Sequence, residues 1–557
     1  MKTKALPRRA ARTLAAVLTA IAIPLSACST TQSTQAADNV LTYLEPNTFT
    51  TLYPPSAGYY PNGGVLNQIT DRLLYQDPES LELSPWIATE LPEINQDATE
   101  FTFHLREDVT YSDGSPLDAA NVVKNFNLFA NGDKNRQLTG SEQITNYDYG
   151  EVVDDYTVRF HFSAPAPGFA QATSSFNAGL LSNSTLDLGN EGFGPGNATN
   201  IIGSGPFTIS EEELGTSLSL AAREDYDWAP QESAHQGRAY LDGIRFILAA
   251  EESVRVGALV AGQADIARQI EAPEEKHLEE QGLIVSAHST NGMNNQLAFR
   301  FRHPLLQDIR VRQAIIAGVD REEIIRTLFS DSYPLPDSAM AHTALGYKSQ
   351  GDAYTYDPHK ATELLEAAGW HRPADDEDGI RTKDGERLAF TINLSTAQPR
   401  SREVITKIQE QLRRIGIDVS LNPGDRATQD TDSLDMNKIQ IRHTMVGRAD
   451  YDVIKSLYHS DNRDSFLNLD TETGKLGDPY LEELLEAVAS TPDEEGRKQA
   501  TGAVQDYLTE QAYILPLFEE PQVYGIQPYV DGFAEEAVGR PWFYNTRINT
   551  AALEERS

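Results

Sequence analysis

A strand–helix–strand pattern between residues 388 and 421 limits the fold most strongly. Apolar and polar residues alternate in two runs, as in half-buried strands. The apolar positions are Leu388, Phe390, Ile392 and Leu394 in the first run and Ile417, Val419 and Leu421 in the second. Between the runs, Ser401 can cap a helix that presents Val404, Ile405, Ile408 and Leu412 on one face and ends at Gly416. This order is that of a βαβ crossover, so we expect an α/β fold.

Capping residues place further elements along the chain. A strand is expected over residues 99–105, where apolar positions again alternate. Candidate helix N-caps are Asp118, Asp320, Asp357 and Asp478, and the last two precede a proline suited to the first helical turn. Asp320 with Glu323 is typical of a capping box. The sequence contains no internal repeat of about 20–50 residues, which excludes solenoid and propeller folds.

The first 27 residues have the layout of an export signal. Five Lys and Arg residues precede an apolar run from Thr13 to Leu25. This run is shorter than the ~20 residues that a membrane-spanning helix needs. We therefore expect residues 1–27 to be a signal peptide that is removed. Arg8-Arg9 leaves both the general secretory route and the twin-arginine route open.

The residues Leu25-Ser26-Ala27-Cys28 are similar to the lipobox of bacterial lipoproteins. Cys28 is the only cysteine among 557 residues, and it stands where the lipobox places the acylated residue. The resemblance implies lipidation of Cys28 and attachment to the outer face of the cell membrane. Residues 28–39 are polar and small, which predicts a flexible tether. The alternative is an ordinary secretory signal with a cysteine nearby by chance.

Length and charge restrict the class of protein. Removing residues 1–27 from 557 leaves 530 residues, which indicates two to four domains. The formal charge of −37 becomes −42 once the five cations of the signal are lost. Such an acidic surface repels phosphate backbones, so we expect no nucleic-acid partner. Solubility is sufficient to explain the charge.

Catalytic and metal-binding motifs are missing from the sequence. The eleven histidines are scattered, without a His-Glu-x-x-His motif or a close pair of ligand spacing. The sequence has no Gly-x-Ser-x-Gly elbow, phosphate-binding loop or dinucleotide fingerprint. We therefore expect no catalytic residues, no metal site and no cofactor, and we expect that the protein is not an enzyme.

Short motifs in a shared order resemble one family. They include Leu73-Leu74-Tyr75, Pro85-Trp86-Ile87-Ala88, Thr102-Phe103-His104-Leu105-Arg106, Gly203-Ser204-Gly205-Pro206-Phe207, Asp225-Tyr226-Asp227-Trp228, Gly262-Gln263-Ala264-Asp265-Ile266 and Asp308-Ile309-Arg310-Val311-Arg312. From about residue 40 to about residue 545 the chain resembles the bacterial extracellular solute-binding proteins of family 5, the peptide-type and nickel-type binding lipoproteins of ABC importers. Most matched residues are expected to serve the fold, with Gly203 and Gly205 in backbone turns.

The resemblance implies a two-lobe, periplasmic-binding-protein-like fold of the Venus flytrap type, with an extra subdomain inserted in lobe I. Lobe I would comprise residues 40–67, 201–295 and 517–557, and the inserted subdomain would comprise residues 68–200. Lobe II would comprise residues 296–516. A solute that contacts both lobes would favour the closed form.

The same resemblance points to a candidate ligand residue. In peptide-binding members an aspartate in an Ala-Asp-Tyr context receives the α-amino group of the ligand, and Asp450 matches it within Arg448-Ala449-Asp450-Tyr451. The tryptophan that commonly precedes this motif is absent, since Met445-Val446-Gly447 stand there. This departure puts a peptide ligand in doubt. The alternative for Asp450 is a loop cap or an ion pair.

Other candidate ligand residues follow from their chemistry. Arg442 and Arg448 can receive a ligand carboxylate. Tyr59, Tyr60 and Asn62 can lie at the mouth of a cleft, because binding clefts combine aromatic walls with a few polar groups. The alternative for the two tyrosines is that they are exposed loop aromatics.

The expected function is capture of a small solute for import. The ligand would be a short peptide, an opine-like or metallophore-like compound, or another amine-bearing solute. Its partners would be the permease and ATPase complex of an ABC importer and, through the lipid anchor, the membrane, with the protein acting as a monomer. Two alternatives stay open: an exported hydrolase that acts on envelope polymers, and a sensor lipoprotein that uses the same fold.

Overall fold

The computed structural model describes residues 39–549, apart from 377, 396–397, 423, 425, 434, 463–467 and 471–472, together with residue 551. The predicted signal peptide, Cys28 and all of the predicted tether except Asn39 lie outside the described residues. Across the described part of the chain, no helix has both the length and the apolar character needed to cross a membrane.

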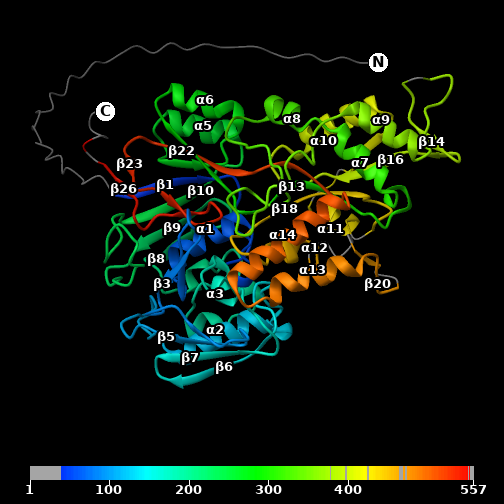
Figure 1. Ribbon diagram of the computed structural model, residues 1–557. Helices are drawn as coiled ribbons and strands as arrows, with labels where there is room; N and C mark the ends of the chain where they lie inside the picture. The colour runs from blue at the N-terminus through cyan, green and yellow to red at the C-terminus, as the bar shows by residue number, and fades with distance from the viewer. Residues whose placement is uncertain are drawn as a thin grey trace, which may run out of the picture. The chain divides into compact units, whose positions relative to one another are not determined.

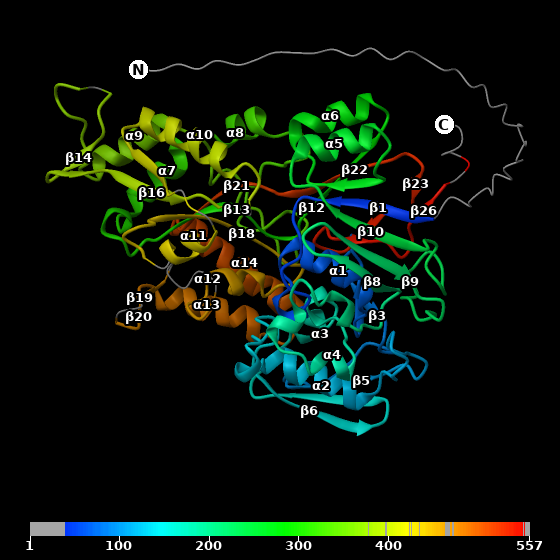
Figure 2. The same cartoon turned by 180° about the vertical axis from the view of Figure 1, so that it is seen from behind.

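A seven-stranded mixed sheet draws its strands from three separate stretches of chain. Its order is β12-β22-β11-β1-β10-β9-β8. β1 lies parallel to β10 and β11, and the other neighbours pair antiparallel. Helices α5 and α6 cover one face and α1 lies on the other (Figure 1, Figure 2). The bounds are β1 (Val40–Glu45), α1 (Tyr60–Ile69), β8 (Phe207–Glu213), β9 (Ser217–Ala222), β10 (Gly243–Leu248), α5 (Glu252–Val260), β11 (Ile266–Arg268), α6 (Ala272–Glu280), β12 (Ile284–Ser289) and β22 (Pro521–Ile526).

The predicted βαβ unit forms part of a second, five-stranded sheet. The strand order is β17-β16-β18-β13-β21, and β16 and β17 pair in parallel with α10 between them in sequence. The prediction of an α/β fold is therefore confirmed. The bounds are β13 (Gly292–Phe299), β16 (Ala389–Asn393), α10 (Ser401–Arg414), β17 (Asp418–Asn422), β18 (Ile441–Gly447) and β21 (Ile514–Phe518).

The four predicted aspartate caps are confirmed. They precede α2 (Ala119–Asn131), α8 (Arg321–Leu328), α9 (Pro358–Ala367) and α13 (Pro479–Ser490), and each side chain accepts a hydrogen bond from a backbone N–H of the first turn. The capping box at Asp320 is half formed. Glu323 donates its backbone N–H to Asp320 at 2.8 Å, but the N–H of Asp320 donates to Gln411 Oε1 instead of to Glu323.

The prediction that Ser401 caps α10 is wrong. Ser401 is the first helical residue, and Arg400 takes the cap position with a left-handed backbone. The Ser401 hydroxyl accepts a hydrogen bond from the backbone N–H of Ser395 at 3.1 Å and lies 2.9 Å from His443 Nδ1. His443 is a tertiary partner on β18, which the local pattern could not reveal.

A smaller four-stranded sheet lies within the predicted inserted segment. Its order is β4-β5-β7-β6, and α2 packs against β6 and β7 (Figure 1). The predicted strand over 99–105 is confirmed as β5, whose Phe101 and Phe103 meet Phe126 of α2 and Phe160 of β7 in a shared aromatic core. The bounds are β4 (Glu93–Ile94), β5 (Glu100–His104), β6 (Tyr147–Asp154) and β7 (Thr157–Phe162).

The chain crosses between the two large sheets at two adjacent places. One crossing is residues 290–291, between β12 and β13, and the other is residues 519–520, between β21 and β22. A hydrogen bond of 2.9 Å from the backbone N–H of Thr290 to the carbonyl of Glu520 joins them. Two short links that run side by side restrain the sliding of one sheet past the other. They restrain bending between the two sheets less.

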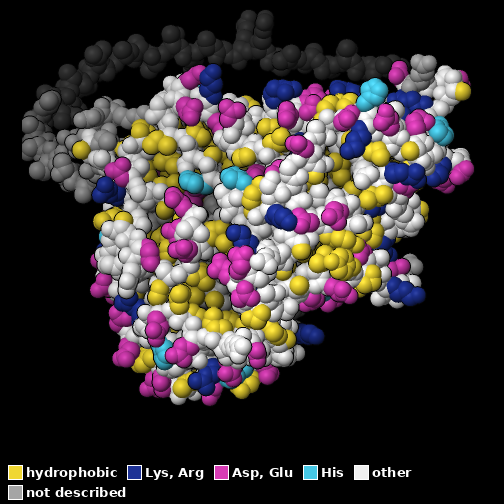
Figure 3. Space-filling view, in the orientation of Figure 1, with side chains coloured by type: hydrophobic (Ala, Val, Ile, Leu, Met, Phe, Trp, Pro, Cys, Tyr) yellow, Lys and Arg dark blue, Asp and Glu magenta, His cyan; other side chains and the backbone are white. Residues whose placement is uncertain are grey.

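Two buried hydrophobic clusters support these layers. One joins the four-stranded sheet to one face of the seven-stranded sheet. The other joins the opposite face, with α5 and α6, to the five-stranded sheet and its helices. Acidic side chains are dispersed over the visible face rather than gathered in one patch (Figure 3). The remaining elements are β2 (Leu74–Gln76), β3 (Leu83–Pro85), α3 (Phe169–Ala172), α4 (Asn183–Leu186), α7 (Ile309–Gly318), β14 (Thr382–Lys383), β15 (Glu386–Arg387), α11 (Arg426–Asp432), α12 (Val453–Tyr458), β19 (Leu469–Asp470), β20 (Lys475–Leu476), α14 (Glu494–Glu510), β23 (Val530–Asp531), β24 (Ala534–Glu535), β25 (Pro541–Trp542) and β26 (Arg547–Ile548).

Candidate functional site: a pocket between distant chain segments

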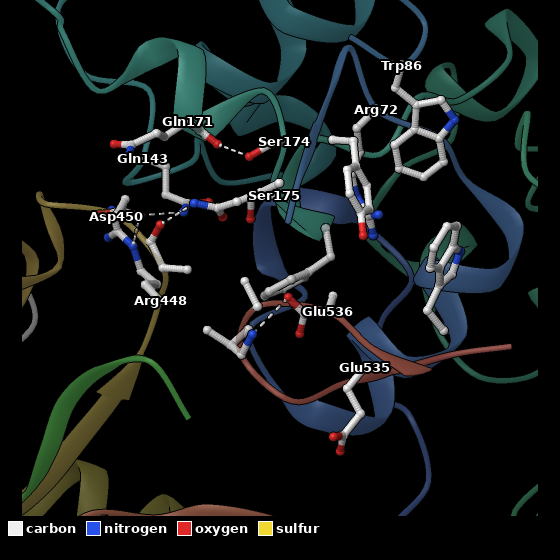
Figure 4. A pocket seen from close by; sticks show the side chains of 17 residues that line it. Arg72, Trp86, Gln143, Gln171, Ser174, Ser175, Arg448, Asp450, Glu535 and Glu536 are labelled. Atoms are coloured by element: carbon white, nitrogen blue, oxygen red, sulfur yellow. Dashed lines mark hydrogen bonds and ion pairs between the residues drawn. The ribbon is translucent and has the colours of Figure 1, made fainter. Parts of the chain in front are cut away.

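A pocket lies where four distant stretches of chain meet. Its walls come from residues 72–86, 143–176, 448–450 and 535–542, and its cavity volume is about 40 Å³. The first two stretches adjoin the four-stranded sheet, the third follows β18 of the five-stranded sheet, and the fourth is near the C-terminus. Figure 4 shows side chains from these stretches converging on it.

Arg448 and Asp450 form one wall as a buried ion pair. The Arg448 guanidinium donates two hydrogen bonds to the Asp450 carboxylate, each 2.9 Å long. The two side chains are 7% and 8% exposed. Burial acts against the charged Arg448, but Asp450 and Glu142 outweigh it and hold the pKa of Arg448 above its ordinary value. The ion pair that the sequence left open for Asp450 is therefore present.

Side chains from the segment around the four-stranded sheet reach this wall. Gln143 donates to Asp450 Oδ2 at 3.1 Å, and Gln76 donates to the carbonyl of Ala449 at 2.9 Å. Glu142 Oε1 lies 3.7 Å from Arg448 Nη1, within ion-pair range but beyond a hydrogen bond. The loop after β18 is thus tied to residues more than 300 positions earlier.

Arg72 and Trp86 form the opposite wall (Figure 4). The Arg72 guanidinium lies 5.4 Å from the centroid of the Trp86 ring, and it donates from Nη2 to Asn67 Oδ1. Arg72 is 5% exposed. Burial lowers the pKa of Arg72 to about 10, which leaves the guanidinium charged at neutral pH.

Aromatic rings surround this wall. Trp86 and Trp542 have ring centroids 6.0 Å apart, and Tyr75 lies 6.2 Å from Trp86 and 5.9 Å from Trp542. Rings at these separations form a rigid apolar surface on which the flat part of a solute can lie.

Two carboxylates come from the C-terminal stretch. Glu536 accepts hydrogen bonds from the backbone N–H groups of Val538 at 3.2 Å and Arg540 at 3.0 Å, and from Arg540 Nη1 at 3.3 Å. Glu535 forms an ion pair with His288, and burial raises the pKa of Glu535 to about 7. Each of these carboxylates already has a protein partner.

The structure brings only two of the predicted ligand residues, Arg448 and Asp450, into the pocket. Tyr451 points to α14, where its hydroxyl donates to Glu494 Oε1 at 3.3 Å and Arg497 covers its ring. Burial raises the pKa of Tyr451 to about 12. Arg442 lies on β18, and the described residues that line the pocket do not include it.

Tyr59, Tyr60 and Asn62 lie at the start of α1, and none lines the pocket in the described part of the chain. Asn62 is buried, and its Oδ1 accepts a hydrogen bond from the backbone N–H of Thr50 at 2.7 Å. Tyr60 donates its hydroxyl proton to the carbonyl of Val538, which is itself a lining residue. Tyr60 therefore supports the pocket from behind.

Sequence reasoning missed Arg72, Gln143 and Trp542. Arg72 directly precedes a matched motif without belonging to it, and Trp86 falls inside a motif of the set whose residues were mostly expected to serve the fold. Trp542 is one of only four tryptophans, which is a weak signal. Gln143 has no sequence signal at all, because its role depends on where Asp450 lies.

Comparisons with known proteins agree with this architecture. The model of the family described as bacterial extracellular solute-binding proteins, family 5 Middle, matches residues 82–465. The oligopeptide-binding protein AppA of Bacillus subtilis (strain 168) is 25% identical over 435 residues, which cover 74% of this chain and 76% of AppA.

Solved structures show the same fold. NikA from Brucella suis in complex with Fe(III)-EDTA has a TM-score of 0.78 at 24% identity, covering 92% of this chain and 99% of NikA. The ABC transporter-associated periplasmic binding protein DppA from Helicobacter pylori in complex with peptide STSA has a TM-score of 0.74 at 20% identity, covering 92% of this chain and 98% of DppA. The expected periplasmic-binding-protein-like fold is confirmed, and the chain belongs to the bacterial extracellular solute-binding proteins of family 5.

Proposed function

We propose that this protein captures a small solute in the pocket between Arg72 and Arg448 and delivers it, chemically unchanged, to the permease and ATPase of an ABC importer. Family membership supports solute binding outside the cytoplasm. The observation that carries the proposal is the pocket itself, whose walls come from both halves of the chain and meet around buried charged groups. Such a site closes on a solute only when the halves come together.

The two large sheets are the proposed cores of two lobes. The seven-stranded sheet would belong to lobe I, with residues 68–200 as its inserted subdomain, and the five-stranded sheet to lobe II. The hinge would be formed by the two links at residues 290–291 and 519–520, where the chain crosses from one sheet to the other. They lie a few residues outside the predicted lobe II of 296–516, so we set the proposed boundaries at the crossings.

The arrangement described corresponds to the proposed closed form. Among the described residues, three hydrogen bonds would connect the inserted subdomain to lobe II: Gln76 to Ala449, Gln143 to Asp450, and Arg497 Nη1 to Gln171 Oε1 at 3.4 Å. The Gln76 bond joins neutral groups and is worth about 1 kcal/mol net, whereas the other two each involve a charged group and are worth about 1.5–3 kcal/mol. Opening would break them and admit the solute.

Known relatives bind chemically different solutes. AppA is an oligopeptide-binding protein, NikA holds Fe(III)-EDTA and DppA holds a peptide in the structures compared. An amine at Asp450 would have to share the carboxylate with Arg448, which already donates two hydrogen bonds to it. We therefore retain Asp450 as a lining residue and do not assign it the ammonium of the ligand.

Solute binding predicts a large stabilisation of the folded protein. A solute at one hundred times its dissociation constant should raise the free energy of unfolding by about 2.7 kcal/mol, because only the folded state binds it. Thermal unfolding with peptide, opine, metal-chelate and sugar libraries measures this effect. If no solute raised the unfolding midpoint, solute capture would be excluded.

A pair of tryptophan variants controls this measurement. Ala449→Trp places an indole in the pocket wall and should abolish the shift. Val254→Trp places the same group on the exposed surface of α5 and should leave the shift unchanged. A shift retained in Ala449→Trp would indicate that the solute binds elsewhere.

We also propose that Cys28 anchors the mature protein to the membrane. The lipobox-like sequence and the polar residues after it support this proposal. Acylation predicts a mature N-terminus at Cys28 whose mass includes acyl chains, and Cys28→Ser should release the protein from membranes. An unmodified N-terminus elsewhere, measured by mass spectrometry of the native protein, would contradict the anchor.

A further inference from the structure

We propose that the pocket selects an acidic solute and that Arg72 binds its carboxylate. This inference rests on the proposed function, because it assumes that the pocket is the solute site. It reverses the expectation that an acidic residue at position 450 receives an amine.

Arg72 is a buried cation whose charge has no close counter-ion. No carboxylate lies within 4.0 Å of its guanidinium in the part of the chain that the structure describes, and Nε has no hydrogen-bond partner among the described residues. The neighbouring Asp71 accepts hydrogen bonds from Tyr226 at 3.1 Å and Trp228 at 2.8 Å. Glu536 and Asp71 act on Arg72 only at longer range. A desolvated guanidinium in this state gains strongly from a carboxylate with fork geometry.

The carboxylates of the pocket are already engaged. Asp450 is held by Arg448 and Gln143, Glu536 by Arg540 and two backbone N–H groups, and Glu535 by His288. An incoming ammonium would have to compete with Arg448 for Asp450 and with Arg540 for Glu536. When His288 is protonated, it would also have to compete with His288 for Glu535. An incoming carboxylate would meet no competing carboxylate at Arg72 among the described residues, since the partner of its Nη2 is the amide of Asn67.

The buried pocket groups without a hydrogen-bond partner in the described part of the chain include both donors and acceptors. Besides Arg72 Nε, the donors are Trp86 Nε1, Trp542 Nε1 and Arg448 Nη1, of which the last lies within ion-pair range of Glu142. The acceptors are Gln143 Oε1 and the two carboxylate oxygens of Glu535, which forms an ion pair with His288. Figure 4 places Arg448 across the pocket from Arg72. The donors among these groups fit a solute with a carboxylate at the Arg72 end and further oxygen acceptors toward Arg448, and its flat part would lie against the tryptophans.

The backbone holds Arg72 in position before any solute arrives. Its carbonyl accepts a hydrogen bond from the N–H of Ile87 at 3.2 Å. The preceding residue, Asp71, donates its N–H to Ser204 Oγ at 3.1 Å and accepts from the N–H of Leu180 at 2.9 Å. A preorganised site of this kind loses little conformational entropy on binding.

The test uses carboxylates of known structure as probes. Acetate, citrate and the peptide Ala-Ala-Ala are titrated at constant ionic strength against the wild-type protein, with acetamide, citramide and Ala-Ala-Ala-amide as matched probes that lack the carboxylate. The acids should stabilise the wild-type protein and bind at least tenfold more tightly than the amides. Equal binding of acids and amides, or stabilisation by the amides alone, would overturn the assignment.

Variants separate binding from structure. Arg72→Gln should weaken carboxylate binding at least tenfold without lowering the unfolding midpoint of the solute-free protein, because it removes an uncompensated buried charge. Arg310→Gln disrupts the partly exposed pair with Asp308, far from the pocket in sequence, and should leave carboxylate binding unchanged. If Arg72→Gln lowered the unfolding midpoint of the solute-free protein but left its affinity for carboxylates unchanged, Arg72 would have a structural role and the proposal would be overturned.

The two proposals fail differently. If neutral or amine-bearing solutes stabilise the protein as well as acids do, the acidic preference is wrong and solute capture stands. If no solute of any charge stabilises it, both are wrong.

Discussion

Arg448→Met is expected to lower the free energy of unfolding by about 3–5 kcal/mol, because it leaves the Asp450 carboxylate buried without its cation. Asp450 would keep only the hydrogen bond from Gln143. Its side chain is 8% exposed, so water replaces little of what is lost. Denaturant-induced unfolding at neutral pH measures the change.

A double variant and a surface pair control this prediction. Arg448→Met combined with Asp450→Leu removes both charges and should recover most of the lost stability, because a buried pair replaced by apolar residues is often neutral. Arg387→Met disrupts a surface ion pair with Asp418, in which the two side chains are 61% and 35% exposed. This variant should lower the free energy of unfolding by less than about 1 kcal/mol. If Arg448→Met alone cost no more than this surface variant, Asp450 would not be desolvated.

Gly203→Ala is expected to lower the free energy of unfolding by about 3 kcal/mol or more, because the added methyl group cannot be accommodated. Its Cβ would lie 1.9 Å from the carbonyl oxygen of Ile69. That carbonyl is fixed, since it accepts a hydrogen bond from the N–H of Gly205 at 2.9 Å. Any displacement would move the segment that leads to Arg72, so binding of a carboxylate should weaken as well.

Gly257→Ala is the matched control. Gly257 lies inside α5, and a Cβ there would meet nothing within 4 Å. Alanine is a better helix former than glycine, so this variant should gain up to about 1 kcal/mol. Thermal and denaturant unfolding of both variants measure the contrast. If Gly203→Ala matched the wild type, the close approach to Ile69 would be unimportant.

Local signals predicted much of the fold. The alternation around Phe390 and Val419 and the four aspartate caps report on residues a few positions apart, and these elements are confirmed. The prediction that Ser401 is a cap failed because its hydroxyl bonds the backbone of the preceding loop at Ser395 and the tertiary partner His443 instead of the first turn of the helix. Gly203 and Gly205 were expected in turns, yet neither has a positive φ, and both are needed for close approach of backbone to Ile69.

The site was predictable only in part. Family resemblance led to the Arg448–Asp450 loop, but it could not show that the two side chains neutralise each other. That loop comes to line one pocket with Arg72, Gln143 and Trp542 only when distant segments of the chain fold together. No local pattern contains that information, and the absence of a carboxylate partner for Arg72 among the described residues is a property of the packed structure alone.

The central claim is that the protein binds a solute and releases it unaltered. The most direct test is to recover the solute that co-purifies with the native protein, identify it by mass spectrometry, and titrate it back into solute-free protein by calorimetry. We predict saturable binding of one solute per chain, with the solute recovered chemically intact after prolonged incubation. Conversion of the solute into a product, or the lack of saturable binding, would contradict the account.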